Sequence, residues 1–404
     1  MMWPRPVAFT NARVVAAHGE ARSIRFDRRI LGLDDPPRDG DHVVDLNGAW
    51  VLPGLINAHD HLELNHYGSQ HAAAPYRNVR QWVDDMRTRL HEDPVIVNGR
   101  ARSLAARVWL GGFKNLLAGV TTVAHHNPIY PGLRRVTPVR VVHRFGWAHS
   151  FGMQRQPVGA RGELGGDVRA RFHITPRSAP FVLHLAEGVD AEAMDELPRL
   201  DDAGALAENT VLVHGVAIDR VGWKLVAARG ASAVWCPASN LALFGATMDI
   251  RQALAALPGR VALGTDSRLS GSRDLLDELQ VASREGALTP DECLSLVTSG
   301  PAAVLRCAPA GRLVTGGLAD LIVLPAHEGR AGEALAACRR HQVQLVVFDG
   351  RPRVGVPEWA DVFRARGIAI AAMRLDGQPR IADAKVLRAA SEFGMHEPGV
   401  ELCH

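Results

Sequence analysis

The clearest hydrophobic pattern in the chain is an apolar run that ends in two histidines. The run covers residues 51–61, VLPGLINAHDH, and its apolar residues predict a fully buried strand. Because side chains on a strand alternate between its faces, His59 and His61 should point the same way at its carboxyl end. Two such imidazoles form half of a metal site, although a polar loop that happens to hold two histidines would look the same.

Short β-type runs precede this strand, and a strand–helix alternation follows it. Residues 5–50 predict a small antiparallel sheet, because their short apolar runs are separated by turn residues. Further on, strands are expected at 119–125, 138–147, 180–188, 210–215, 231–240 and 260–267. Helices are expected over 101–118 and near 190–206, 249–257 and 273–286, with another ending near 230. The alternation predicts parallel strands, and about eight units predict a closed barrel.

The β-type pattern returns after residue 307. The predicted architecture is therefore an α/β protein, a distorted (β/α)8 TIM barrel over residues 51–307. A small discontinuous β-sandwich domain is expected from both chain ends, residues 1–50 and 308–358. The C-terminal extension, 359–404, carries weak signals for one strand near 367–371 and one helix near 383–392.

The fourth strand–helix unit of this barrel is expected to be short. Residues 151–170 are rich in glycine and lack helical periodicity, which leaves little room between the third strand and the next motif. The segment RFHIT, residues 171–175, is predicted to be the strand of this unit, with almost no helix after it.

Composition narrows the class of protein. A chain of 404 residues with 47% hydrophobic residues can bury a large core, and a net charge of +3 without a basic run gives no reason to expect a nucleic-acid partner. The five cysteines are scattered without CxxC spacing, which favours a reducing compartment and argues against a thiolate zinc site. We find no signal-peptide pattern and no membrane-spanning stretch, so a cytoplasmic protein without a membrane partner is expected.

Polar residues recur at the ends of the predicted strands. They are His59, His61, His125, His126, His184, His214 and Asp266. The carboxyl ends of barrel strands share one face, so these residues should meet there. A buried histidine or aspartate needs a partner, and any one of them alone would more often be a hydrogen-bonded core or capping residue. Their joint placement favours a mononuclear site for zinc, with ferrous iron as the alternative.

The motifs resemble those of the amidohydrolase superfamily, in the deaminase-like branch that includes chlorotriazine hydrolases, cytosine deaminase and guanine deaminase. The resemblance covers residues 5–355 and rests on PGLINAHDH, GVTTVAH, HLAEG, VLVHGV, CPASN, LGTDS and GRLVTGGLADLIVL, in that order. It implies one divalent metal ion, and commonly a homo-oligomer. The residues it implies are the metal ligands His59, His61, His184 and Asp266, the orienting residue His214, and the proton shuttle Glu187.

The expected chemistry follows from these residue types. A divalent metal lowers the pKa of bound water toward about 7. Glu187 could protonate a ring nitrogen and then the leaving amine, although an acid at a helix N-terminus is the alternative interpretation. Asp266 could take the proton of the water, and His214 could polarise the developing oxyanion.

Lysine usage argues against a second, bridged metal. Lysine is absent between Lys114 and Lys224, so the carboxylated lysine that bridges two metals in binuclear relatives is not available. At the second predicted strand, His125 and His126 are additional to the residues that the family pattern leads us to expect. One of them is a candidate to contact substrate, with a histidine bonded to backbone at a loop start as an equal alternative.

Two loops complete the sequence picture. The long segment after His61 is a candidate lid, since loops at this face of a barrel carry specificity. The segment CPASN is expected only to shape a loop, with Ser239 and Asn240 as turn or capping residues.

Three classes of function stay open at this point. The first is a hydrolytic deaminase of a small aminated heterocycle. The second is a hydrolase of another C–N bond, such as imidazolone ring opening or amide cleavage, because it uses the same residues. The third and most distant is a non-catalytic assembly protein on the same fold.

Overall fold

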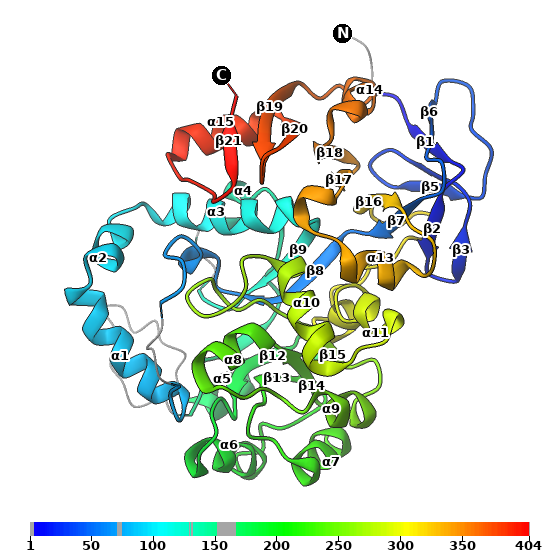
Figure 1. Ribbon diagram of the computed structural model, residues 1–404. Helices are drawn as coiled ribbons and strands as arrows, with labels where there is room; N and C mark the ends of the chain where they lie inside the picture. The colour runs from blue at the N-terminus through cyan, green and yellow to red at the C-terminus, as the bar shows by residue number, and fades with distance from the viewer. Residues whose placement is uncertain (1–3, 71–74, 129, 131, 152–166, 404) are drawn as a thin grey trace.

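The computed structural model describes residues 4–70, 75–128, 130, 132–151 and 167–403. Among these residues no helix is both long enough and apolar enough to cross a membrane. Figure 1 shows a lower layer of strands covered by helices and an upper β-rich layer, in which blue strands from the N-terminal part lie beside orange strands from the C-terminal part.

The lower layer is built on parallel strands. Within the described residues they form two sheets, in the orders β10-β9-β8 and β11-β12-β13-β14-β15. Their bounds are β8 (Leu55–Asp60), β9 (Val120–His125), β10 (Arg140–Val142), β11 (Gly146–Ala148), β12 (Phe181–Leu185), β13 (Thr210–His214), β14 (Ser232–Trp235) and β15 (Val261–Leu263). The amides of Thr265 and Asp266 donate to the carbonyl of His59 and so join the two sheets on one side. The α/β class is confirmed, and the arrangement is TIM-barrel-like.

Helices cover these strands. They are α3 (Leu104–Leu117), α4 (Leu133–Val136), α5 (Val168–Ile174), α6 (Ala191–Asp202), α7 (Arg220–Ala228), α8 (Pro237–Phe244), α9 (Ile250–Ala256), α10 (Leu275–Gly286), α11 (Pro290–Ser295) and α12 (Ser299–Val304). Several begin at a side chain that accepts a backbone hydrogen bond, as Asp190 and Asp219 do from Ala193 and Gly222. Such caps satisfy the free amides of a first turn and therefore fix where each helix starts.

Three helices follow His61, and the first two lie wholly or partly within the loop expected at residues 62–82. These are η1 (Leu62–Leu64), α1 (Val79–Glu92) and α2 (Pro94–Arg100). The side chain of Asn78 caps α1, and the amide of Val79 donates to the carbonyl of Glu187. This backbone hydrogen bond therefore holds the start of α1 beside the end of β12, next to Glu187.

The fourth unit differs from the prediction. The single strand expected at 138–147 is two strands, β10 and β11. The strand predicted for RFHIT is also wrong, because this segment lies at the end of α5. Asp167 caps α5 by accepting from Ala170, and Phe172 packs edge-on against Phe181 at 5.5 Å. β11 already occupies the place beside β12. Of the glycine-rich segment, residues 152–166 lie outside the described part of the chain.

The run 51–61, predicted to be one strand, belongs to two strands that lie in different sheets. Its first half continues β7 (Ala49–Pro53), which pairs antiparallel with β16 (Leu321–Ala326), and its second half is β8. Gly54 separates the two. A Cβ at Gly54 would lie 2.3 Å from the Thr121 side chain, so only glycine allows the close approach of β9 at this crossing.

The upper layer contains two sheets. The order of the larger is β21-β19-β20-β18-β17-β16-β7-β2-β3, and that of the smaller is β5-β4-β1-β6. The remaining strands are β1 (Val7–Thr10), β2 (Arg13–Ala16), β3 (Gly19–Ala21), β4 (Ile24–Phe26), β5 (Ile30–Leu33), β6 (His42–Asp45), β17 (Leu345–Phe348), β18 (Arg351–Gly355), β19 (Ile370–Leu375), β20 (Gln378–Asp383) and β21 (Val400–Leu402). The other helices are α13 (Ala331–Ala337), η2 (Arg340–Gln342), η3 (Pro357–Trp359), α14 (Ala360–Ala365) and α15 (Ala384–Phe393). The division into domains proposed from the sequence stays a prediction.

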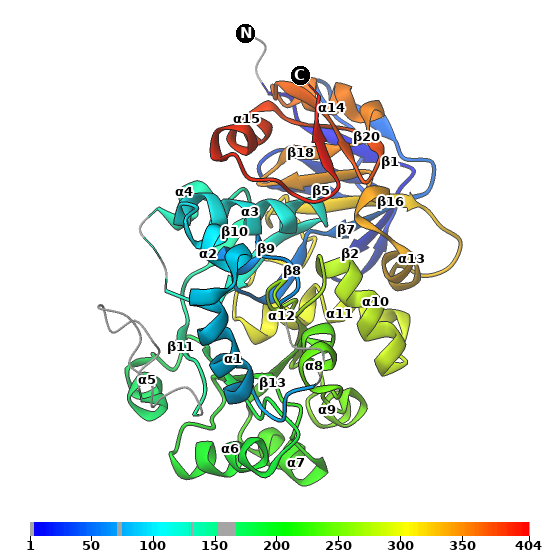
Figure 2. The same ribbon diagram turned by 60° about the vertical axis from the view of Figure 1, so that its left-hand side comes forward.

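The C-terminal extension lies against both layers. β19 and β20 extend the larger sheet beyond β18, and in both ribbon views α15 lies above α3 (Figures 1 and 2). Trp109 of α3 contacts Phe393 of α15, with ring centroids 5.7 Å apart. The extension therefore packs on the helix layer that surrounds the parallel strands.

Candidate active site

His59 and His61 lie side by side at the end of β8. Their ring centroids are 4.9 Å apart, and His59 is fully buried. Neither ring nitrogen of His59 has a hydrogen-bond partner. A buried polar atom without a partner is costly, so this ring fits a position whose partner is a ligand or metal.

Four further histidines and one carboxylate gather around this pair. Within each of three overlapping sets the possible metal-binding atoms lie within 4.8 Å of one another: His59, His61 and Asp266; His59, His184 and His214; and His126, His149 and His184. Burial, and after it the neighbouring imidazoles, lowers the pKa of His59, His126 and His184 well below 6.5. These rings are therefore neutral at neutral pH and keep a free lone pair for a metal.

Asp266 is held by hydroxyl groups on one of its oxygens. Ser239 and Ser270 donate to Oδ2 at 2.8 and 3.1 Å, and the amide of Ser267 donates to Oδ1 at 2.7 Å. Nε2 of His61 lies 3.5 Å from the same Oδ1. Asp266 also has a φ of 52°, a left-handed conformation that a non-glycine residue adopts at a cost of about 1–3 kcal/mol. Strain of this kind is typical of functional sites.

His214 has its ring orientation fixed by Asn240. Its Nδ1 lies 2.8 Å from Oδ1 of Asn240, while the amide nitrogen of Asn240 donates to Thr247. The carbonyl oxygen of Asn240 can only accept, so Nδ1 carries the proton and Nε2 presents a lone pair. That lone pair lies 3.6 Å from Oε1 of Glu187. His214 also has a positive φ, of 78°.

Glu187 lies just after β12 and is 4% exposed. Burial is the main cause that raises its pKa well above 4.5, and the charges of Asp266 and Glu196 add to the effect. The raised pKa favours the protonated form of the carboxyl group, which can donate. The segment 187–189 is held against the start of α1, where the amide of Val189 donates to the carbonyl of Arg77.

The two remaining predicted residues, His125 and His126, separate from each other. The His126 ring stacks on His184 with centroids 4.3 Å apart. His125 turns away, where its Nδ1 accepts from the amide of Leu62 and lies 3.7 Å from Glu63. Of the two, His126 belongs to the histidine cluster, and the substrate-binding role assigned to either stays a prediction.

Sequence reasoning missed several residues of this site. His149 follows β11 and joins the cluster, and its position after a short apolar strand was the available signal. Ser239 and Asn240, expected only to shape a loop, instead hold Asp266 and His214. No local signal could have found these two contacts, because each joins separate strand ends.

A small cavity opens beside the cluster. Its volume is about 130 Å³, and it is lined by His61, Leu64, Val79, Trp82, Asn127, His149, His184, Glu187, His214, Asp266 and Ser267. Val79 and Trp82 come from α1, so the segment predicted as a lid supplies an apolar wall. A substrate in this cavity would touch the acid, the imidazoles and the indole together.

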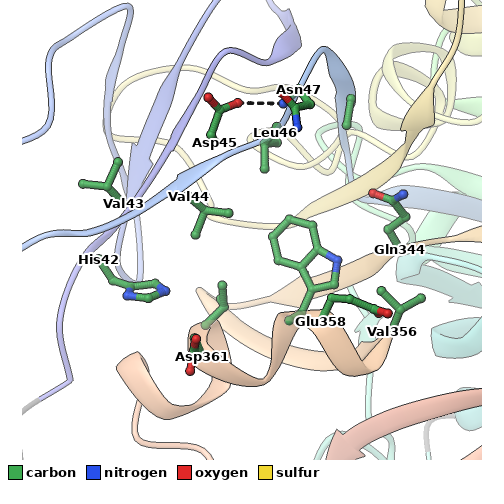
Figure 3. Close-up of a pocket in the computed structure, with 13 residues that line it drawn as sticks. His42, Val43, Val44, Asp45, Leu46, Asn47, Gln344, Val356, Glu358 and Asp361 are labelled. Carbon is green, nitrogen blue, oxygen red and sulfur yellow. Dashed lines mark hydrogen bonds between the residues drawn. The ribbon is translucent and has the colours of Figure 1, made fainter.

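A larger cavity, of about 710 Å³, lies in the upper layer. Figure 3 shows its lining residues, with Val43 and Val44 of β6 on one side and Gln344 and Val356 on the other, and Trp359 also lines it. None of the three metal-competent sets described above borders it. Chemistry rather than size therefore identifies the smaller cavity as the candidate active site.

A buried ion pair lies on the other face of the strand that carries His59 and His61. Asp60 lies between His59 and His61 in β8, and its carboxylate is 3.1 Å from Nζ of Lys114 on α3, with both side chains fully buried. Asn57 donates to the same carboxylate at 3.2 Å. This network fixes the strand from the face opposite the two imidazoles.

Comparison with known proteins agrees with this geometry. The model of the amidohydrolase family matches residues 180–353, from β12 to β18. A 5-methylthioadenosine/S-adenosylhomocysteine deaminase of Haloarcula marismortui is 26% identical over 74% of this chain and 80% of that protein. The resemblance to the deaminase-like amidohydrolases is confirmed.

Solved structures share the amidohydrolase-like fold. A triazine hydrolase variant matches 96% of this chain and 99% of its own with a TM-score of 0.70, at 18% identity. An adenosine deaminase from Xanthomonas campestris, solved with bound zinc, matches 91% and 98% with a TM-score of 0.69, at 19% identity. In this chain the histidine–carboxylate cluster could hold a divalent metal ion.

Proposed function

We propose that this chain is a metal-dependent hydrolytic deaminase of a small aminated heterocycle. The observation that carries the proposal is the meeting of a buried carboxyl group, Glu187, with His214 and a histidine–carboxylate cluster in one cavity. The deaminase relative and the zinc-bound adenosine deaminase support the same reaction class. The site would lie at the carboxyl end of a closed, distorted (β/α)8 barrel.

The residues present fit one divalent ion. His59, whose ring nitrogens have no other partner, would hold it together with His61, His184 and Asp266. Three imidazoles and one carboxylate favour zinc, with ferrous iron as the alternative. When bound, such an ion lowers the pKa of a coordinated water toward about 7 and so supplies a hydroxide nucleophile.

Glu187 is the proton carrier of the proposed reaction. Its raised pKa favours the protonated form, which donates to a ring nitrogen and makes the adjacent ring carbon more electrophilic. As a carboxylate it then accepts a proton from the nucleophile and delivers it to the leaving amine, which departs as ammonia. One carboxyl group thus serves both transfers.

His214 and Asp266 position the attack. Asn240 leaves Nε2 of His214 without a proton, so this ring accepts at first and can donate to a developing oxyanion only after it gains a proton. Oε1 of Glu187 lies 3.6 Å from this nitrogen. Asp266 is fixed by Ser239 and can take the first proton of the nucleophilic water.

The test is to supply aminated heterocycles to metal-replete protein and follow ammonium together with substrate absorbance. Glu187→Gln should keep metal and lose on the order of a hundredfold or more in kcat. His214→Asn should lower kcat by roughly a hundredfold if it serves as one oxyanion donor. Glu285→Gln, an exposed change on α10, should leave kcat unaltered. Turnover without ammonium, with a product heavier by one water, would replace deamination with ring opening.

A further inference from the structure

His126, His149 and His184 come from three different strand ends and form a cluster beside the proposed metal site. The ring centroids are 4.3 Å apart for His126 and His184, 6.1 Å for His126 and His149, and 5.9 Å for His149 and His184. One ring nitrogen from each lies within 4.8 Å of the other two. All three side chains are more than nine-tenths buried.

The free nitrogens of this cluster are ready to bind a cation. Nε2 of His126 donates to the carbonyl of Ala148 at 2.9 Å, so its Nδ1 carries the lone pair. That Nδ1 is buried without a hydrogen-bond partner, and so are Nδ1 of His149 and Nδ1 of His184. The amide of His184 donates to the carbonyl of His149, which keeps these two strand ends adjacent.

We propose that His126, His149 and His184 form a second, weaker site for a divalent transition-metal ion such as Zn²⁺. Three imidazoles and one open position match the preferences of zinc, copper and nickel, whereas magnesium and calcium prefer oxygen ligands. The set contains no carboxylate, so it binds a cation less tightly than the set that includes Asp266.

The second site shares His184 with the ion of the proposed hydrolytic site. A neutral imidazole binds one metal at a time, so the two ions compete for this ring. Occupation of the second site draws His184 away from the first ion, and excess metal is therefore inhibitory. This inference rests on the proposed function only for that inhibition, because the binding itself does not depend on the reaction.

The experiment is equilibrium dialysis of the one-zinc protein against increasing buffered free Zn²⁺, with zinc per chain measured by elemental analysis. Wild-type protein should take up a second equivalent at free zinc concentrations above those that fill the first. His149→Gln and His126→Gln should each keep the first equivalent and bind the second at least about tenfold more weakly. His18→Gln, a change at an exposed histidine, should behave as wild type.

Each result decides the question. Saturation of wild-type protein at one zinc overturns the second site, as does a second equivalent that both variants bind as tightly as wild type does. If one variant fails to fold, the other and the wild-type stoichiometry still give the answer. Where a substrate is turned over, the second equivalent should lower the rate in wild type but not in His149→Gln. Failure to release ammonia would reject the deaminase while leaving the zinc stoichiometry unaffected.

Discussion

Two buried polar regions lie close together in this protein, and they are built in opposite ways. In the histidine cluster (His59, His61, His126, His149 and His184) every ring has at least one buried nitrogen without a hydrogen-bond partner. In what we term the arginine joint (Arg268, Arg340, Asp376 and Glu397) each charged group faces an opposite charge at hydrogen-bond distance.

The arginine joint connects the C-terminal extension to the loop that carries Asp266. Arg268 donates two hydrogen bonds to Glu397, at 2.8 and 2.7 Å, and Arg340 donates to the same carboxylate at 2.6 Å. Burial alone would raise the pKa of Glu397, but the two guanidinium groups outweigh burial and the pKa lies below its usual value. The joint thus holds the loop that carries Asp266 through charges that are already paired.

The difference teaches which buried polar groups are structural. Paired charges stabilise one arrangement of the chain, and removal of either partner leaves a costly buried charge. Unpartnered buried imidazoles do not stabilise the folded state by themselves, because their lone pairs have no hydrogen-bond donor or metal to bind.

The strongest test removes the ring with two unpartnered nitrogens. His59→Ala should lose the tightly held ion and all hydrolytic activity, because His59 belongs to the ligand set that contains Asp266. Glu187→Gln should retain the ion, as should His18→Ala at the surface. Elemental analysis of protein expressed with ample metal should find about one tightly held ion in wild type. Two such ions, or none, would contradict the assignment.

The next test breaks the arginine joint. Glu397→Ala should lower the free energy of unfolding by about 3–5 kcal/mol, because Arg268 and Arg340 would remain buried without their shared partner. Glu401→Ala is the matched control, since that carboxylate is exposed and lies 3.9 Å from Arg374. Urea unfolding of both variants measures the difference. A loss below about 1 kcal/mol for Glu397→Ala would show that the joint is not structural.

A third test concerns pH, at the buried carboxyl group of Glu278. Glu278 accepts from the amides of Ala238 and Ser272, and burial raises its pKa from 4.5 to about 7. The folded state therefore keeps a proton that the unfolded state has released, so stability falls as pH rises from about 4.5 to 7. The expected loss relative to Glu278→Gln is about 3 kcal/mol, with no further change above pH 7. Parallel stability curves for the two proteins would contradict the shift.

The smallest effect is expected at the contact that orients the metal-binding carboxylate. Ser239→Ala removes the hydrogen bond to Oδ2 of Asp266 but leaves the one from Ser270. Metal affinity should fall by about tenfold, as is usual for a group that orients a ligand. Ser391→Ala, which alters a helix side chain on α15, should leave affinity unchanged. Competition with a chelator measures both, and equal affinities would show that Ser270 alone suffices.

The sequence by itself determined the α/β class and the gathering of the main site residues. His59, His61, His184, His214 and Asp266 all follow apolar runs, and parallel strands bring their carboxyl ends to one face. Strand alternation is a local property, so the shared direction of the first two imidazoles could be predicted from a few residues.

Tertiary structure alone decided the contacts that hold these residues in place. Asn240 reaches His214 across 26 positions and Glu397 reaches Arg268 across 129, and no local pattern encodes such pairs. It also decided that RFHIT is a helix, because β11 had already filled the place beside β12 and Asp167 could cap a helix turn. Periodicity describes which face of an element is buried, whereas the identity of a neighbour depends on how the whole chain packs.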